Sequence, residues 1–180
     1  ASKTPCALPV LTHSERLSSG ARGIRLPLLR ALRSFYTEHG KINESMEKVR
    51  LLGFSQDPKT YKVTPVEEEP AIGVLALTAS TGLSLAESIV LEGERAGVDT
   101  SHLVGKADAF FSYSWSGTTL DDLIEAVTDA TQRLVDDDGV PLPEPAVWID
   151  IFCASQNLLI GNYRDDANHP KGSLGYAVRT

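Results

Sequence analysis

Asp150 is the residue of this 180-residue chain with the most evident capacity for chemistry. It lies inside the apolar run AVWIDIFC (146–153), and a carboxylate in such surroundings needs hydrogen-bond donors or an opening to solvent. If the run is a strand, Trp148, Asp150 and Phe152 share one face. The carboxylate could then accept structural bonds from Ser or Thr hydroxyls of a neighbouring loop, or it could contact a ligand. Buried carboxylates serve in both roles.

The loop SWSGTT (114–119) offers a second set of polar groups. Hydroxyls and backbone N–H groups at the expected start of a helix suit an anion or a ribose phosphate. Asp121 and Asp122 oppose this, because they place negative charge on the first helical turn, where they satisfy the helix dipole and repel phosphate. We therefore favour a capped helix start over an anion site. With Asp150, the candidate ligand-binding residues are Ser114, Ser116, Gly117 and Thr118.

The cysteines and histidines give no catalytic or metal-binding pattern. Cys6 and Cys153 lie far apart and form neither a CxxC motif nor a Cys/His cluster, so we expect no metal site and no disulfide framework. Cys153 could be a nucleophile only with a base nearby, and no histidine motif supplies one. We favour a buried, inert thiol, and we expect no cofactor.

One strand-helix-strand unit must position these candidates. The stretch ADAFFSY (107–113) predicts a strand, apolar residues at helical spacing follow from Leu120, and 146–153 predicts a second strand. Either Thr118 or Thr119 could cap the helix, and DDDG (136–139) is expected to end it. Strands joined by a helical crossover pair in parallel. If AIGVLALT (71–78) is also a strand, the order is βαβαβ, although its periodicity alone does not exclude a helix.

The N-terminal part has a different character. Residues 1–26 predict an extended arm, and Pro27 then opens a basic amphipathic helix that stops at Gly40. We favour a helix that packs on the core with a solvated Arg face over one that binds an anionic membrane or an acidic partner. The candidate partner-binding residues are Arg22, Arg25, Arg30 and Arg33.

The middle of the chain predicts short elements. We expect a helix at 41–50, a turn-rich connection at 53–70 with a short strand at 60–63, and a helix from a Ser84/Glu87 capping box to Gly97. The expected organisation is an arm (1–26), a helical and turn-rich segment (27–70) and an α/β core (71–180).

Composition excludes several classes of protein. With 42% hydrophobic and 23% charged residues the chain is neither disordered nor fibrous, and no apolar run approaches the roughly 18 residues that span a bilayer. The net charge is −7, yet residues 1–50 hold nine Lys/Arg against four Glu. The acidic remainder argues against nucleic acid as its main ligand. The basic, Ser-containing start is similar in composition to a plastid or mitochondrial transit peptide, so an organelle is an alternative to an unspecified intracellular location.

The stretches SHLVGKADAFFSYSWSGTTLDDLIEAV and AVWIDIFCASQNLL resemble TIR-like domains, in particular those in large proteins of algae and other protists. The resemblance covers residues of about 101–165. It implies a parallel, flavodoxin-like three-layer α/β core that self-associates in signalling. Some TIR domains cleave NAD with a Glu on a helix after the second strand, but this chain has no Glu past Glu144. We therefore assign no catalytic residue to this chain from the resemblance, and we expect the core to be incomplete.

A shorter resemblance points to a sugar phosphate. Ser114-Trp-Ser-Gly-Thr-Thr119 followed by DDL is similar to the SxSGxT loop with which sugar isomerase (SIS) domains hold sugar phosphates.

The leading hypothesis is a non-enzymatic accessory or scaffold subunit that binds a protein partner within a larger assembly. It has no transmembrane segment, and contact with a membrane surface is an alternative. The enzyme alternative is an NAD hydrolase or sugar-phosphate-binding enzyme that uses the loop 114–118.

Overall fold

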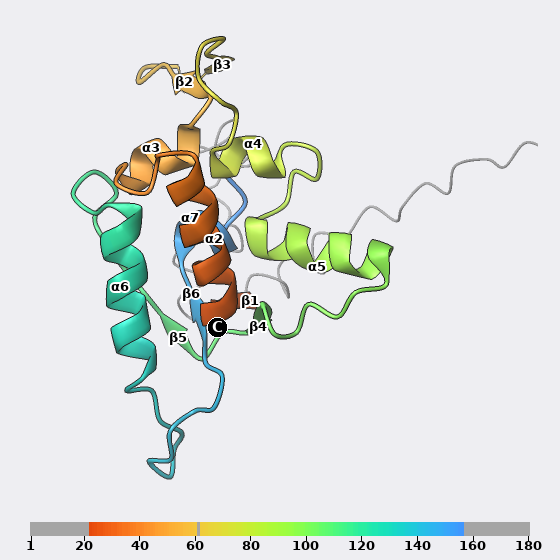
Figure 1. The fold of residues 1–180 in the computed structure, drawn as a ribbon, viewed down its shortest axis with the longest axis vertical. Helices are drawn as coiled ribbons and strands as arrows, with labels where there is room; N and C mark the ends of the chain where they lie inside the picture. The colour runs from red at the N-terminus through yellow and green to blue at the C-terminus, as the bar shows by residue number, and fades with distance from the viewer. Residues whose placement is uncertain (1–21, 61, 157–180) are drawn as a thin grey trace, which may run out of the picture.

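The computed structural model describes residues 22–60 and 62–156, which form an α/β fold around a mixed four-stranded sheet. The order of the strands in the sheet is β4-β1-β6-β5, and a separate hairpin pairs β2 with β3 (Figure 1). The sheet strands are β1 (Arg22–Arg25), β4 (Val104–Lys106), β5 (Ala109–Phe110) and β6 (Ala146–Trp148).

The predicted strand-helix-strand unit is confirmed in outline. Strand β5 pairs with β6 in parallel, and α6 (Leu120–Thr131) connects them. Thr119, rather than Thr118, caps α6, since its hydroxyl accepts the amide of Asp122 while the Asp122 carboxylate accepts the amide of Thr119. The helix ends at Thr131, before the predicted stop at 136–139. The latter segment is a separate turn, in which the Asp136 carboxylate accepts two later amides.

The prediction of a parallel, flavodoxin-like sheet is wrong. Strand β1 runs antiparallel to both of its neighbours, β4 and β6, so that most of the pairing is antiparallel. The sequence predicts an extended arm for these residues, because RGIR contains one large apolar side chain and lacks the pattern of a strand. Ile24 alone supplies the apolar anchor, and it is fully buried between the two partner strands.

Two other predicted strands are corrected. The segment 71–78 is not a strand, because it contains the short helix α4 (Val74–Thr78), where the Thr78 hydroxyl donates to the Val74 carbonyl. The run 146–153 is a strand only as far as Trp148, and α7 (Asp150–Cys153) then begins. The strand stops there because the Asp150 carboxylate accepts the amide of Ile151, which folds the backbone into a helical turn.

The remaining elements largely follow their local signals. The basic helix is α2 (Leu26–Glu38), with Pro27 in its first turn, and Gly40 follows it at φ +66°. Helix α5 (Leu85–Ala96) has the predicted capping box and ends at Gly97. Between them lie α3 (Met46–Leu51), β2 (Phe54–Gln56) and β3 (Val63–Pro65). The predicted strand at 60–63 thus lies slightly later in the chain.

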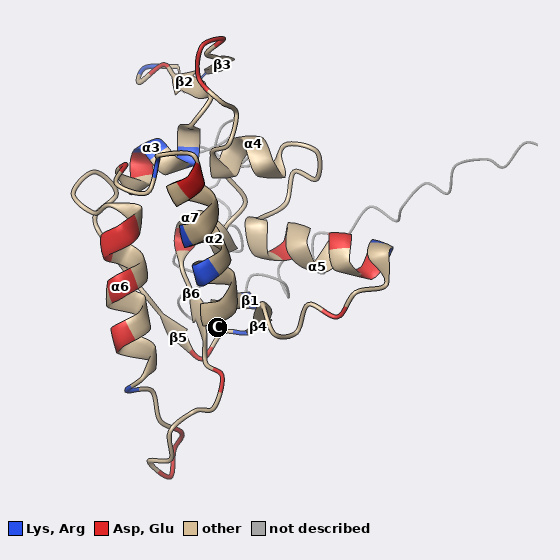
Figure 2. Ribbon diagram, viewed as in Figure 1, with Lys and Arg blue, Asp and Glu red and all other residues tan. Residues whose placement is uncertain are grey.

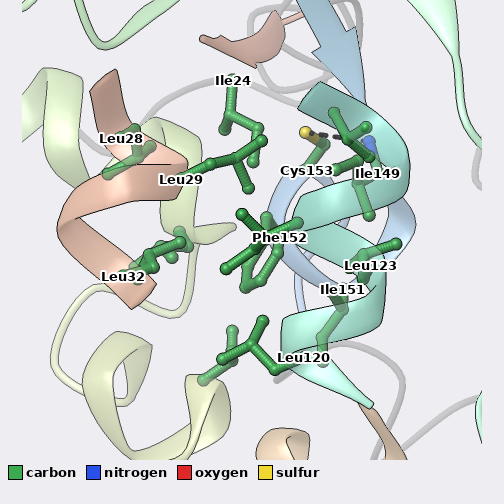
Figure 3. Packing of buried hydrophobic residues seen from close by; sticks show 14 of the residues in the cluster. Ile24, Leu28, Leu29, Leu32, Leu120, Leu123, Ile149, Ile151, Phe152 and Cys153 are labelled. Carbon is green, nitrogen blue, oxygen red and sulfur yellow. Dashed lines mark hydrogen bonds between the residues drawn. The ribbon is translucent and has the colours of Figure 1, made fainter. Parts of the chain in front are cut away.

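The core forms where α2 and α6 pack side by side over the sheet (Figure 1). Figure 3 shows Phe152 of α7 between apolar side chains of β1, α2 and α6. Ile24, Leu29, Leu123 and Phe152 are all fully buried. Burying each such side chain contributes roughly 1.5–3 kcal/mol. A helix of four residues has little stability of its own, so the packing of its apolar side chains holds α7 in place. This packing holds Asp150, the first residue of α7, in place.

Candidate functional site

Asp150 lies at the junction of β6 and α7, and both of its carboxylate oxygens accept hydrogen bonds from the chain. The Tyr113 hydroxyl donates to Oδ1 at 2.6 Å, and the Trp115 indole N–H donates to Oδ2 at 2.7 Å. The Ile151 amide also donates to Oδ1 at 2.7 Å. The donors predicted for a structural role were Ser or Thr hydroxyls. The structure instead supplies the aromatic residues on either side of Ser114.

Arg50 of α3 forms the second half of the same polar network. It is only 7% exposed, and its guanidinium donates to the Gln156 side-chain oxygen at 3.0 Å and to the Gln56 oxygen at 2.9 Å. It also lies 5.9 Å from the centre of the Trp115 ring, within the range of a cation–π contact. The Gln156 amide donates to the Asp150 carbonyl at 3.2 Å, so Arg50 and Asp150 are joined through Trp115 and Gln156.

Burial shifts the pKa of two ionisable groups in this network. Burial raises the pKa of Tyr113 well above its usual range, and the bond to Asp150 raises it further, so the phenol stays a protonated donor. Burial lowers the pKa of Arg50, while Glu47 acts in the opposite direction. Arginine stays charged even so, because its unperturbed pKa is so high. The network therefore holds a buried cation next to neutral amide acceptors.

The loop 114–119 is closed by its own backbone. The Ser114 hydroxyl accepts the Gly117 amide at 3.3 Å, and the Ser114 carbonyl accepts the Thr118 amide at 3.0 Å. Ser114, Ser116 and Gly117 are exposed, and Thr118 is half-buried. None of these candidates hydrogen-bonds Asp150, whose partners are Tyr113, Trp115 and Ile151. Trp115 thus brings the loop against Asp150, but the four candidate residues of the loop do not bond the carboxylate.

The N-terminal amides of α6 are also occupied. The amides of Leu120 and Asp121 donate to the carbonyls of Glu44 and Ile42, at 3.1 and 3.2 Å. The Asp122 amide donates to the Thr119 hydroxyl, and the next amide donates to the Thr119 carbonyl. An anion at a helix N-terminus binds through such free amides. All four are engaged within the chain, and the segment 42–44 lies where a phosphate would have to bind.

The four arginines predicted to bind a partner have different environments. Arg25 pairs with the Glu144 side chain at 3.6 Å and also donates to the Glu144 carbonyl. Arg33 pairs with Asp121 at 2.6 Å and with Glu125 at 3.5 Å, which ties α2 to α6. Arg30 is exposed on α2, and Arg22 begins β1. Two of the four are thus engaged within the fold, whereas Arg22 and Arg30 form no ion pair with the described residues.

Cys153 has the environment of an inert thiol. It is 4% exposed, and burial raises its pKa to about 12. Its sulfur accepts the Ile149 amide at 3.4 Å. A thiol becomes nucleophilic by losing its proton, so this cysteine is poorly suited to covalent catalysis.

Sequence reasoning missed Arg50, Tyr113, Trp115 and Gln156. A local signal existed for two of them, because Tyr113 and Trp115 are aromatic residues with polar tips that alternate with serines after a strand. No local signal existed for Arg50 and Gln156, which are 106 positions apart and meet only in the fold. A surface hollow on the hairpin β2–β3 includes Gln56 among its lining residues, but its other lining residues belong to the hairpin and not to this network.

The described residues define an α/β protein with a mixed sheet and a closed polar network at the end of its parallel strand pair. Within this part of the chain no helix has the length and apolar character to cross a membrane, and no three His, Cys, Asp or Glu side chains are grouped as a metal site requires. In comparisons with known proteins, no family model, no curated protein and no solved structure matches the chain.

Proposed function

We propose that this chain is a non-enzymatic interaction protein, an accessory or scaffold subunit that acts through its surfaces and not through a catalytic pocket. One observation carries the proposal: the groups best suited to hold a ligand are engaged inside the chain. Both Asp150 oxygens accept bonds from internal donors, and the amides that open α6 donate to internal carbonyls and hydroxyls. A polar network that is fully satisfied gives rigidity and a unique structure.

The TIR-like resemblance supports a binding role for this chain but not an NAD-cleaving activity. It covers residues of about 101–165, a stretch that begins before β4 and extends past α7, and so includes the loop 114–119 and Asp150. TIR domains act largely through contacts with other proteins, and this segment offers no Glu in the position of the NAD-cleaving residue. We therefore propose a degenerate core that keeps a binding role.

The first experiment tests for a ligand site. The protein is heated with NAD, ADP-ribose or glucose 6-phosphate, and its melting temperature is compared with that of the protein alone. A ligand present at a hundred times the Kd of a real site would raise the free energy of unfolding by about 2.7 kcal/mol. For a chain of this size this corresponds to a rise in melting temperature of roughly 5–10 °C. We expect no shift. A shift that Ser116→Ala abolishes would contradict the proposal.

The second experiment tests for a partner. The tagged chain is compared on one size-exclusion column as the purified protein and in an extract of the cells that produce it. We expect the extract to give a species much larger than the 19.4 kDa monomer. Elution as a monomer in both samples would remove the support for an accessory role.

An enzyme that binds a nucleotide or sugar phosphate is the second candidate function. Its specific support is position, because Ser114, Ser116 and Asp150 follow the carboxyl ends of the parallel strands β5 and β6, where ligands of α/β proteins usually bind. Turnover of NAD, measured as nicotinamide release by the purified chain, separates this candidate from a pure binding module.

A further inference from the structure

Strand β4 forms one edge of the described sheet and carries an unusual pair of charges. The antiparallel register places Lys106 of β4 directly opposite Arg22 of β1. Like charges directly opposite each other in a sheet are destabilising, whereas opposite charges stabilise it. The pair therefore weakens the pairing of β4 with β1.

The pattern of hydrogen bonds brings the two cations close together. The Arg25 amide donates to the Leu103 carbonyl at 2.9 Å, so this opposed pair is hydrogen-bonded. Hydrogen-bonded and non-hydrogen-bonded pairs alternate along antiparallel strands, and Arg22 and Lys106 are three steps further along the same register. They form a non-hydrogen-bonded pair, with Cα atoms about 4.5 Å apart and side chains in their closest arrangement.

No acid neutralises the pair within residues 22–60 and 62–156. The ion pairs of the described chain involve neither Arg22 nor Lys106. Asp108 is the nearest acid in the sequence to Lys106, and its carboxylate accepts the Ala146 amide at 2.8 Å. Arg25 is engaged with Glu144. The repulsion between Arg22 and Lys106 thus has no internal compensation in the described fold.

The backbone of Lys106 provides a second binding element. In a non-hydrogen-bonded pair the N–H and C=O of each residue point away from the opposite strand. Those of Lys106 therefore point from β1 toward the outer edge of the sheet, and no described residue bonds them. The outward amide of Val104 donates to the Thr100 carbonyl at 3.1 Å, so among the described residues it is the Lys106 end of β4 that offers an unpaired amide. Unpaired backbone groups on an edge strand are a template for one further strand.

We propose that the β4 edge, together with Arg22 and Lys106, binds an extended acidic segment of a partner protein by strand addition. This inference rests on the proposed function and names the chemistry of the partner. The segment would pair with the Lys106 backbone while its carboxylates neutralise both cations. Nucleic acid is disfavoured as the anion, because the chain has a net charge of −7 and α6 and the loop before β6 carry acidic residues (Figure 2).

The test uses the full chain and a fluorescent peptide of alternating Glu and Thr. Anisotropy should rise with protein concentration, and raising the salt concentration to about 1 M should reverse it. A Gln-Thr peptide should bind at least about tenfold more weakly, because it lacks the charge. A peptide with every second amide methylated should lose binding too, because it cannot pair as a strand.

Two variants distinguish this edge from the general charge of the protein. Lys106→Glu should weaken peptide binding by at least about tenfold, yet raise the melting temperature by roughly 1–3 °C, since Arg22 gains an opposite charge. Lys59→Glu makes the same charge change on the exposed turn between β2 and β3 and should leave binding within about twofold. Lys106→Gln serves if Lys106→Glu does not fold, and it should show a smaller effect in the same directions.

The outcomes separate this inference from the proposed function. Equal losses from Lys59→Glu and Lys106→Glu, tighter binding of single-stranded DNA than of the peptide, or a lower melting temperature for Lys106→Glu would each overturn it. An absence of peptide binding would overturn it too, while a large complex in the extract and a negative ligand screen would leave the proposed function standing.

Discussion

At the scale of single residues, Asp150 determines how the end of the parallel strand pair is built. A half-buried carboxylate is tolerated there because Tyr113, Trp115 and the Ile151 amide donate to it. Hydrogen bonds to a charged acceptor contribute about 1.5–3 kcal/mol each, more than bonds between neutral groups. The carboxylate thus links the loop after β5 to the start of α7.

Asp150→Asn is expected to destabilise the fold by about 2 kcal/mol. The amide of Asn presents an NH2 group to the Trp115 indole N–H or to the Tyr113 hydroxyl, so that one donor loses its acceptor. The free energy of unfolding in urea measures the loss. Tyr113→Phe removes one donor to the charged carboxylate and keeps the ring, so it should cost about 1.5–3 kcal/mol. Loss of less than about 0.5 kcal/mol from Asp150→Asn would show that the network contributes little.

The sequence revealed part of this site, and for a definable reason. Asp150 was evident because a charge inside an apolar run demands a partner. The identity of the partners was not evident, because hydroxyl residues are the common donors in loops and the two aromatic donors resemble core residues. Arg50 was not evident at all, since only closure of the fold brings it to Gln156.

At the scale of elements, local signals located the helices better than the strands. The capping box at Ser84 was readable, and the cap of α6 was narrowed to Thr118 or Thr119, because a cap and its acidic partner lie three residues apart. The short run 71–78 was ambiguous, since a short apolar run fits a buried strand as well as one turn of helix. Strand β1 has no local signal and is specified by its two neighbours.

Thr119→Ala is expected to destabilise the protein by about 1 kcal/mol, because the amide of Asp122 loses its acceptor at the start of α6. Thr118→Ala is the matched control. Its carbonyl accepts the Met46 amide, which the substitution leaves in place, so the loss should stay within about 0.5 kcal/mol. Chemical denaturation of the two variants measures both values. Equal losses would contradict the assignment of the cap to Thr119.

Gly53→Ala is expected to be more harmful than Gly40→Ala. Both residues have positive φ, at +91° for Gly53 and +66° for Gly40, which costs about 1–2 kcal/mol for a residue with a Cβ. At Gly53 the new Cβ would also overlap the backbone of Ala71, whereas at Gly40 it meets open space. The chain between α3 and β2 would have to move away from the segment that precedes α4. Melting temperatures of the two variants measure the difference, and equal values would show that the contact with Ala71 yields easily.

At the scale of the whole molecule, burial of weak acids makes the stability of the fold depend on pH in the alkaline range. Burial raises the pKa of Cys153 to about 12 and raises that of Tyr36 and Tyr113 above their usual range. The unfolded chain releases these protons at lower pH, near 9 for the thiol and near 10 for the phenols. The native state therefore binds more protons than the unfolded state in this window, and stability falls as the pH rises.

The urea midpoint should consequently be constant from about pH 7 to 8 and should fall steadily above about pH 9. Tyr113→Phe removes one of the three groups, and Cys153→Ala removes another. Each variant should start less stable and then lose stability less steeply with pH than the unmodified chain. A midpoint that does not change up to about pH 11 would contradict the burial of these protons in the native state.

The central position of β1 has a consequence for synthesis of the protein. Ile24 pairs with Val104 on one side and with Val147 on the other, so the strand made first needs partners that are made much later. At roughly 5–20 residues per second, the ribosome needs on the order of 6–25 s to proceed from Ile24 to Val147. During that interval the edge of β1 that will pair with β6 lacks its final neighbour, and the other edge lacks β4 until Val104 has been made. A nascent chain of this kind depends on its early helices, or on chaperones, to stay soluble until β6 closes the sheet.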